Sequence, residues 1–150
     1  MEIRGERRIA APRSRVWAAL LDPDALRDAI PGCQSLVESG PDSYDVTATV
    51  GVAIFRGTVS GRITIEQSNP EHALRVVASG DGDGDALAGG LTVELEDLAR
   101  GDEGTRLSYV AELGAAGAPG GAAARVLERI AKSMAARFFD AIAERVEATN

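Results

Sequence analysis

The sequence predicts an α+β fold in which a curved antiparallel sheet of about seven strands wraps around a long C-terminal helix, with two short helices after the first strand. Three observations indicate this fold. Residues 12–29 contain two short segments with helical spacing, residues 44–113 alternate apolar and polar side chains, and residues 121–147 repeat apolar side chains at helical spacing. Since 150 residues fit one core, we expect a single domain over residues 1–150.

The N-terminal segment predicts one strand and two helix starts. Apolar side chains share one parity over residues 2–11, which indicates a strand, and Arg7 interrupts that pattern. Pro12 suits the first turn of a helix, because its missing N–H would find no partner there. The pair Asp22-Pro23 repeats this start with a capping side chain before a first-turn proline, so a second short helix follows.

The middle of the chain predicts a meander of strands. Turns between the alternating segments are short, and parallel strands need long crossover connections, so the neighbours are antiparallel. Glycines on these strands can relieve sheet curvature and leave volume beneath the sheet. These glycines are Gly57, Gly61, Gly80, Gly82, Gly84, Gly89 and Gly90. We expect a cavity between sheet and helix; the alternative is that the glycines let the helix pack closely and leave a dry core.

Charge and composition exclude several classes of protein. The chain has 16 basic and 23 acidic residues and a formal net charge of −7, which repels phosphate backbones and disfavours nucleic acid as a partner. One cysteine, Cys33, and one histidine, His72, exclude a disulfide or zinc cluster within one chain. We find no signal peptide or membrane-spanning run, and we expect a cytoplasmic protein with no metal.

The motifs that suggest catalysis or metal binding do not fit their templates. The acidic run DGDGD at residues 81–85 lacks the glycine and glutamate of an EF-hand, where Ala86 and Thr92 stand, so we interpret it as a strand with carboxylates in water. His72 lies in a predicted exposed turn, which disfavours a hydrolase triad. Cys33 has no histidine near it in sequence, and we interpret it as a buried structural thiol.

Large apolar side chains are the candidates for contacting a ligand in the expected cavity, and plain core packing is the alternative. Phe138 and Phe139 point about 100° apart on a helix, so we expect one to pack beneath the sheet and the other to line the cavity rim. Met134 is a flexible filler suited to an adaptable pocket. The full candidate set is Trp17, Leu20, Phe55, Val59, Leu91, Tyr109, Met134, Phe138 and Phe139.

Motifs spread over residues 2–147 resemble one known family. They are the Ile30-Pro31-Gly32-Cys33 run after Asp22-Pro23, the Arg56-Gly57-Thr58 run, the Gly104-Thr105-Arg106-Leu107 run and Phe138-Phe139. On these residues the chain resembles the G-subunit family of carbon monoxide dehydrogenase, within the START-like, helix-grip superfamily, which contains hydrophobic-ligand carriers and polyketide cyclases. It departs from that family at Ala53-Ile54, where Gly-Pro is expected, and at Ala123, where a glycine is expected.

The resemblance implies a helix-grip fold with a hydrophobic cavity under the C-terminal helix. It also implies work beside a molybdenum hydroxylase of the carbon monoxide dehydrogenase type, in assembly, membrane recruitment or electron delivery. The implied partners are the subunits of that enzyme and an apolar small molecule such as an isoprenoid quinone or a lipid, with no other cofactor. Many members continue into a tail with an apolar anchor, whereas this sequence ends at Asn150. We therefore expect membrane contact only indirectly or through a missing C-terminal tail, at the inner face of the membrane.

Three functions follow from this interpretation. The leading one is a non-enzymatic carrier of an apolar ligand. The second is an enzyme of the polyketide cyclase or dehydratase type, which requires a buried acidic or tyrosine side chain inside the cavity, with Tyr109 as the first candidate. The third is an assembly factor without a ligand, which requires a solid core.

Overall fold

The computed structural model describes residues 2–52, 55–82, 85–98, 104–115 and 121–148. The strands are β1 (Glu2–Ile9), β2 (Cys33–Gly40), β3 (Ser43–Val52), β4 (Phe55–Asn69), β5 (Ala73–Gly82), β6 (Asp85–Asp97) and β7 (Thr105–Ala115). The helices are α1 (Arg13–Leu20), α2 (Pro23–Ala29) and α3 (Gly121–Ala148). This order is the predicted one, with two short helices after the first strand and a long helix at the end.

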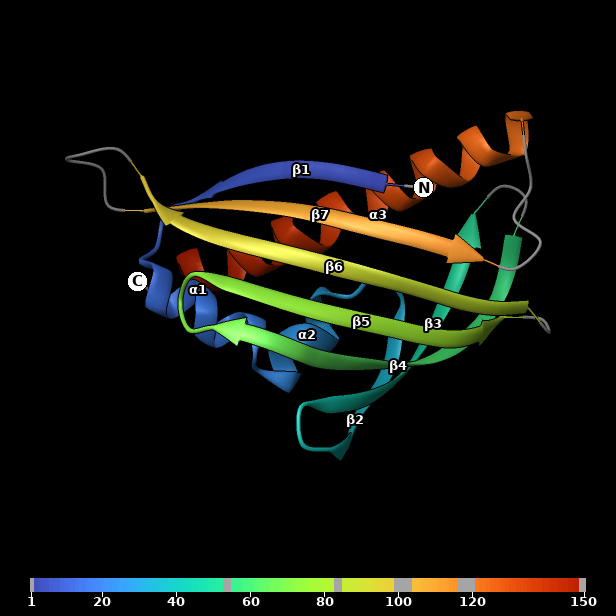
Figure 1. Cartoon of the computed structure of the whole chain (residues 1–150), viewed down its shortest axis with the longest axis horizontal. Helices are drawn as coiled ribbons and strands as arrows, with labels where there is room; N and C mark the ends of the chain where they lie inside the picture. Colours follow the sequence, from blue (N-terminus) through green and yellow to red (C-terminus); the bar gives the residue numbers. More distant parts are fainter. Residues whose placement is uncertain (1, 53–54, 83–84, 99–103, 116–120, 149–150) are drawn as a thin grey trace.

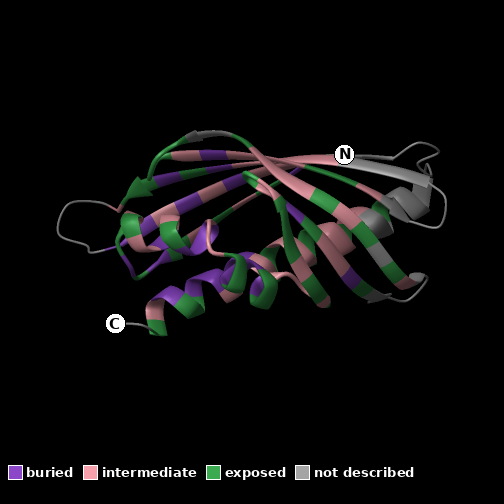
Figure 2. Ribbon diagram, turned by 90° about the horizontal axis from the view of Figure 1, so that it is seen from below, coloured by how far each residue is buried: buried purple, intermediate pink, exposed green. Residues whose placement is uncertain are grey.

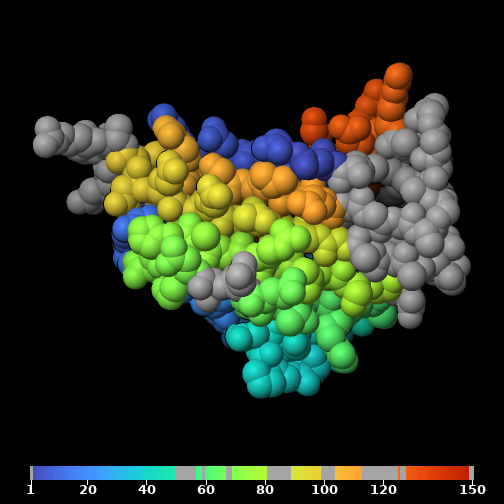
Figure 3. Space-filling model, in the orientation of Figure 1, coloured from blue at the N-terminus to red at the C-terminus, as the bar shows by residue number. Residues whose placement is uncertain are grey.

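The strands form one antiparallel sheet in the order β1-β7-β6-β5-β4-β3-β2. Strands β2 to β7 follow each other as a meander, and β1 completes the far edge by pairing with β7 from Glu2↔Glu112 to Ile9↔Thr105. The sheet curves around α3, while α1 and α2 lie beneath its concave side (Figure 1). Figure 3 shows the convex face, on which the strands form successive bands from β1 to the projecting β2–β3 hairpin. The predicted α+β helix-grip architecture is confirmed.

Strand β2 has no counterpart among the strands that the sequence pattern marks. It is an edge strand that pairs only with β3, and its register shifts near both ends. Leu36 is half-buried, whereas Val37 is 61% exposed. An edge strand with so few buried side chains shows no alternation of period two, so its sequence resembles a loop.

The two short helices begin at the predicted signals, with one offset. Asp22 is the N-cap of α2 and accepts a hydrogen bond from the backbone N–H of Asp24 at 3.1 Å, with Pro23 in the first turn. Pro12, expected inside the first turn of α1, is instead its N-cap, with the extended backbone that a residue in that position adopts. Its carbonyl accepts the N–H groups of Arg15 and Val16.

Two facing glycines let β4 and β5 approach closely where the sheet curves. Gly61 pairs with Gly80. A Cβ atom added to Gly61 would lie 2.7 Å from the carbonyl oxygen of Ser79, and one added to Gly80 would lie 2.8 Å from that of Ser60. Because a side chain would collide with opposing backbone at either position, the pair needs glycine. The predicted role of Gly84 lies outside the described residues.

The interior divides into a packed half and an open half. Around the C-terminal half of α3, Ile142, Ala143 and Val146 are buried against β1, α1 and the ends of β6 and β7. Nearer its N-terminal half, the inward side chains of α3 are only half-buried, as the change from purple to pink along the helix shows (Figure 2). The fold therefore has a dry core at one end and space beneath the sheet at the other.

Arg7 interrupts the alternation of β1 because it joins the strand to α3. It shares the inward parity of Ile3 and Ile9, and its Nε atom lies 2.8 Å from Oδ1 of Asp140. Both side chains are partly exposed, so this ion pair contributes little to stability.

Candidate functional site

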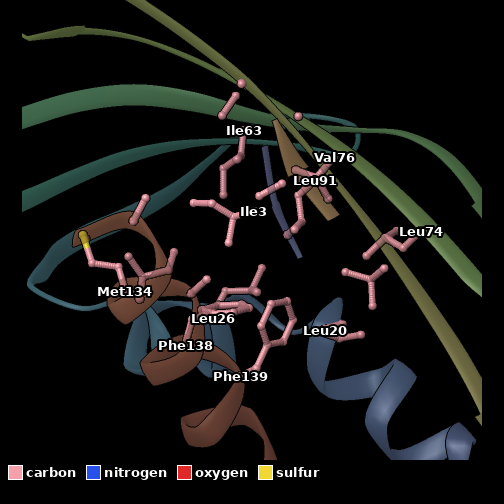
Figure 4. A pocket seen from close by; sticks show the side chains of 18 of the residues that line it. Ile3, Leu20, Leu26, Ile63, Leu74, Val76, Leu91, Met134, Phe138 and Phe139 are labelled. Atoms are coloured by element: carbon pink, nitrogen blue, oxygen red, sulfur yellow. The ribbon is translucent and has the colours of Figure 1, made fainter. Parts of the chain in front are cut away.

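A cavity of about 410 Å³ lies between the concave face of the sheet and α3, and it is partly open to solvent. Figure 4 shows that side chains converge on it from both sides, with Phe138 and Phe139 below and Val76 and Leu91 above. Its volume lies within the range of roughly 300–1,000 Å³ that small-molecule sites occupy.

One face of α3 forms the floor of this cavity. The helix extends over 28 residues, and Ala131, Met134, Ala135, Phe138 and Phe139 line the cavity at spacings of three and four. Beyond Phe139 the same face continues into the dry core. The two alanines place little volume opposite the sheet, and so the helix leaves space there while its next turns pack closely.

Alternating side chains of the central strands form the roof. On β4 and β5 these include Ile63, Val76 and Ala78, and Leu91 stands on β6. Gly89 adds no side chain to this inward row. Small residues on both the sheet and the helix are therefore the local cause of the cavity. Of the seven strand glycines from which the sequence predicts a cavity, Gly89 and Gly90 line it.

The α1–α2 corner and the turn after α2 close one side. Leu20, Leu26, Ile30 and Pro31 line the cavity there. The turn is held to the sheet at Gly32, which has φ +74°, and whose carbonyl accepts a hydrogen bond of 2.9 Å from the N–H of Thr49. Glycine is required because an added Cβ would collide with the carbonyl oxygen of Thr49.

Tyr44 is the single described lining residue whose side chain carries a nitrogen or oxygen atom. It lies on β3, directly opposite Glu38 of β2 and Ile63 of β4, and it is 9% exposed. Burial raises the pKa of its phenol above the ordinary value, and the negative charges of Glu38, Asp42 and Asp22 raise it further. The phenol therefore stays protonated at neutral pH and keeps a hydrogen to donate.

The structure brings part of the candidate set together. Leu20, Leu91, Met134, Phe138 and Phe139 line the cavity. Trp17 packs against the hydrophobic core without lining the cavity. Phe55 and Val59 belong to β4, but their side chains lie outside the described part of the structure.

Tyr109, the first candidate for a polar group in the cavity, does not line it. Its ring stacks on Phe139 with centroids 4.4 Å apart and lies across Gly5 on the neighbouring strand, where an added Cβ would collide with the phenol. Burial, and then the charge of Asp140, raises the pKa of this phenol. Tyr109 is thus a packing residue. The tyrosine that lines the cavity is Tyr44.

Both phenylalanines of α3 line the cavity, contrary to the expectation that only one would do so. Their rings meet edge to face with centroids 4.9 Å apart, Phe139 is buried and Phe138 is half-buried. Phe139 also packs in the core, where its ring stacks on Tyr109, so it combines the two positions that were expected of different residues.

The remaining reactive side chains lie away from this cavity. His72 is exposed in the turn after β4, as predicted, 3.3 Å from the guanidinium of Arg13. Cys33 is half-buried at the start of β2, its Sγ donates to the carbonyl of Ser35 at 3.4 Å, and burial raises its thiol pKa. Of the run at residues 81–85, 83–84 lie outside the described residues, as do the side chains of the others. In the described ranges, no three His, Cys, Asp or Glu residues are grouped around a common metal position.

None of the described helices combines the length and the apolar character that a membrane span requires.

The curved sheet around a long helix, with an apolar cavity between them, defines the class: a protein with the helix-grip fold. Similar solved structures support this fold. A conserved protein from Geobacillus kaustophilus has a TM-score of 0.87 at 24% identity, with 99% of this chain and 97% of that chain covered. The Zhui aromatase/cyclase from Streptomyces sp. R1128 has a TM-score of 0.70 at 17% identity over 98% and 93%. Ara h 8.0201 has a TM-score of 0.71 at 18% identity over 99% and 98%.

The particular family follows from the sequence. The family model of the carbon monoxide dehydrogenase G-subunit, CoxG, matches residues 5–147, so the chain belongs to the CoxG family. No curated protein sequence matches the chain.

Proposed function

We propose that this protein is a non-enzymatic carrier that binds an apolar small molecule in the cavity between the sheet and α3. The observation that supports it is a partly open cavity of about 410 Å³. Its described lining is apolar apart from the hydroxyl group of Tyr44. Burial of apolar surface contributes about 0.8 kcal/mol per methylene, so a ligand with about ten buried carbons gains about 8 kcal/mol toward the cost of association.

The family name supports a role beside a molybdenum hydroxylase such as carbon monoxide dehydrogenase. Electrons removed by such an enzyme must pass to an acceptor, and an isoprenoid quinone has the apolar tail and neutral ring that suit this cavity. Our proposal is therefore that the cargo is a quinone or a lipid of similar polarity, and that the protein serves its dehydrogenase in electron delivery, assembly or recruitment to the inner face of the membrane.

Titration with a short-chain quinone tests this function. Trp17 is the chain's single tryptophan and packs against the core beside α3 and the cavity wall at Leu20. Saturable quenching of its fluorescence is the expected result. A matched variant, Ala131→Leu with Ala135→Leu, occupies about two-fifths of the cavity and should weaken the saturable binding without moving Trp17. Quenching that never saturates, or that is equal in the double variant, would remove the support for a quinone in the cavity.

The two alternative functions, an assembly factor and a cyclase-type enzyme, place different requirements on the cavity. An assembly factor without a ligand requires a solid core, which the cavity does not fit. A cyclase-type enzyme requires a polar group in the cavity, and among the described lining residues Tyr44 is the one that could take part in proton transfer. The second function therefore depends on Tyr44, and loss of turnover of an aromatic polyketide in Tyr44→Phe is its test.

A further inference from the structure

The surroundings of Tyr44 are both apolar and acidic. Tyr44 lines the apolar cavity. Three carboxylates are also close enough for their charge to act on its phenol: Glu38, which pairs with it across β2 and β3; Asp42, in the turn between these strands; and Asp22, the N-cap of α2. We call Asp22, Glu38 and Asp42 the acidic rim.

Two of these charges have no cation to compensate them. Asp22 lies 3.8 Å from Arg145. Glu38 and Asp42 are exposed and form no ion pair within the part of the chain that the structure describes. The arginine nearest in register, Arg62, is engaged with Asp45 at 2.9 Å. No lysine, arginine or histidine occurs among the described lining residues, so an anionic headgroup would find no partner.

The Tyr44 hydroxyl can donate a hydrogen bond to a neutral ligand. It forms no hydrogen bond with the described residues, and it is not one of their fully buried polar atoms, so an acceptor that enters the cavity can reach it. A buried phenol gains by donating its hydrogen to an acceptor that enters the cavity, and a ketone or quinone carbonyl is such an acceptor. A carboxylate would also accept, but it would do so against two uncompensated negative charges.

We propose that Tyr44, Glu38 and Asp42 select the ligand's polar group: they admit neutral molecules that carry a hydrogen-bond acceptor and disfavour carboxylates. This inference rests on the proposed function, since it concerns which apolar ligands the cavity accepts. A headgroup charge held about 7 Å from a carboxylate in the dielectric constant of water would bind about threefold more weakly, and two such carboxylates would weaken binding about tenfold.

Competition with a neutral fluorescent probe measures this selectivity. N-phenyl-1-naphthylamine is bound to the full chain and displaced by dodecan-2-one or by dodecanoate, which differ in headgroup charge. We expect the ketone to bind at least about tenfold more tightly than the carboxylate. In Glu38→Gln with Asp42→Asn, that ratio should fall by about tenfold through tighter binding of dodecanoate. In Tyr44→Phe, the ketone should bind about threefold more weakly while dodecane is unaffected.

Matched controls separate these effects from net charge and from folding. Glu94→Gln with Glu112→Gln removes the same charge from the exposed outer face of the sheet and should leave the ratio unchanged. Tyr109→Phe removes a phenol that does not line the cavity and should not alter ketone binding. If dodecanoate binds as tightly as the ketone, or if both double variants change the ratio equally, the selection is refuted while the carrier function stands. If the probe itself does not bind, the proposed function fails first.

Discussion

Replacing Ala135 by leucine distinguishes a real cavity from a packed core. Ala135 is half-buried and lines the cavity on α3, and the change adds three carbons. At roughly 30 Å³ for each carbon-sized group, they would occupy about 90 Å³, or about a fifth of the 410 Å³. Burying them would contribute at most about 2.4 kcal/mol, at about 0.8 kcal/mol each.

The expected result is therefore an unfolding free energy that stays the same or rises by up to about 2 kcal/mol, together with weaker binding of N-phenyl-1-naphthylamine. Equilibrium unfolding in urea measures the first and probe titration the second. Ala143→Leu is the matched control, because Ala143 is on the same helix, two turns further along, and is 0% exposed in the dry core. Overpacking there should cost about 1–3 kcal/mol.

The two variants must differ for the cavity to be real in solution. If Ala135→Leu lowers the unfolding free energy as much as Ala143→Leu does, the space beneath the sheet is closed in solution. If Ala135→Leu leaves probe binding unchanged, the probe binds elsewhere.

Three further predictions concern single side chains. Gly32→Ala should lower the unfolding free energy by about 1–3 kcal/mol, because Gly32 has a positive φ and an added Cβ would collide with a β3 carbonyl. Gly40 is the control, since an added Cβ there has nothing within 4 Å, and Gly40→Ala should change the free energy little in the same urea titration. Both tyrosines of the chain, Tyr44 and Tyr109, have raised pKa values, so absorbance at 295 nm should show no phenol titrating at the ordinary pKa of 10.0. Since the folded state holds these protons more tightly, the contribution of the two phenols to stability should be constant below about pH 10 and should be lost as the pH rises through their folded pKa values. A full-amplitude transition at pH 10 would contradict the burial of both rings. Phe139→Ala should lower the free energy of unfolding by about 3–5 kcal/mol in thermal or urea unfolding, because Phe139 is 2% exposed and its ring stacks on Tyr109. A decrease below about 1 kcal/mol would show that the packing of this ring contributes little.

The parts of the fold that depend on local periodicity could be predicted from the sequence. Helix α3 and the central strands each bury one face, so their apolar residues recur at regular spacing in the sequence. Strand β2 could not be predicted, because an edge strand with Leu36 half-buried and Val37 exposed shows no alternation. Arg7 looked like an error in the pattern because its partner, Asp140, lies on a helix far away in sequence.

The sequence does not show which tyrosine lines the cavity. Both tyrosines stand on the inward parity of their strands, and sequence cannot say which one meets the cavity. That depends on how far along α3 each strand position lies, which is a matter of sheet register. The β1–β7 register, once known, separates the two: Tyr109 faces Gly5, and an aromatic ring opposite a strand glycine can cover it.

The central claim is that the cavity carries an apolar molecule, and the contents of the protein purified from its own host test it most directly. Solvent extraction followed by mass spectrometry should yield one neutral apolar compound at close to one molecule per chain. The Ala131→Leu with Ala135→Leu variant, purified in parallel, should yield little of it. An empty extract from intact wild-type protein that also fails to bind N-phenyl-1-naphthylamine would contradict the claim.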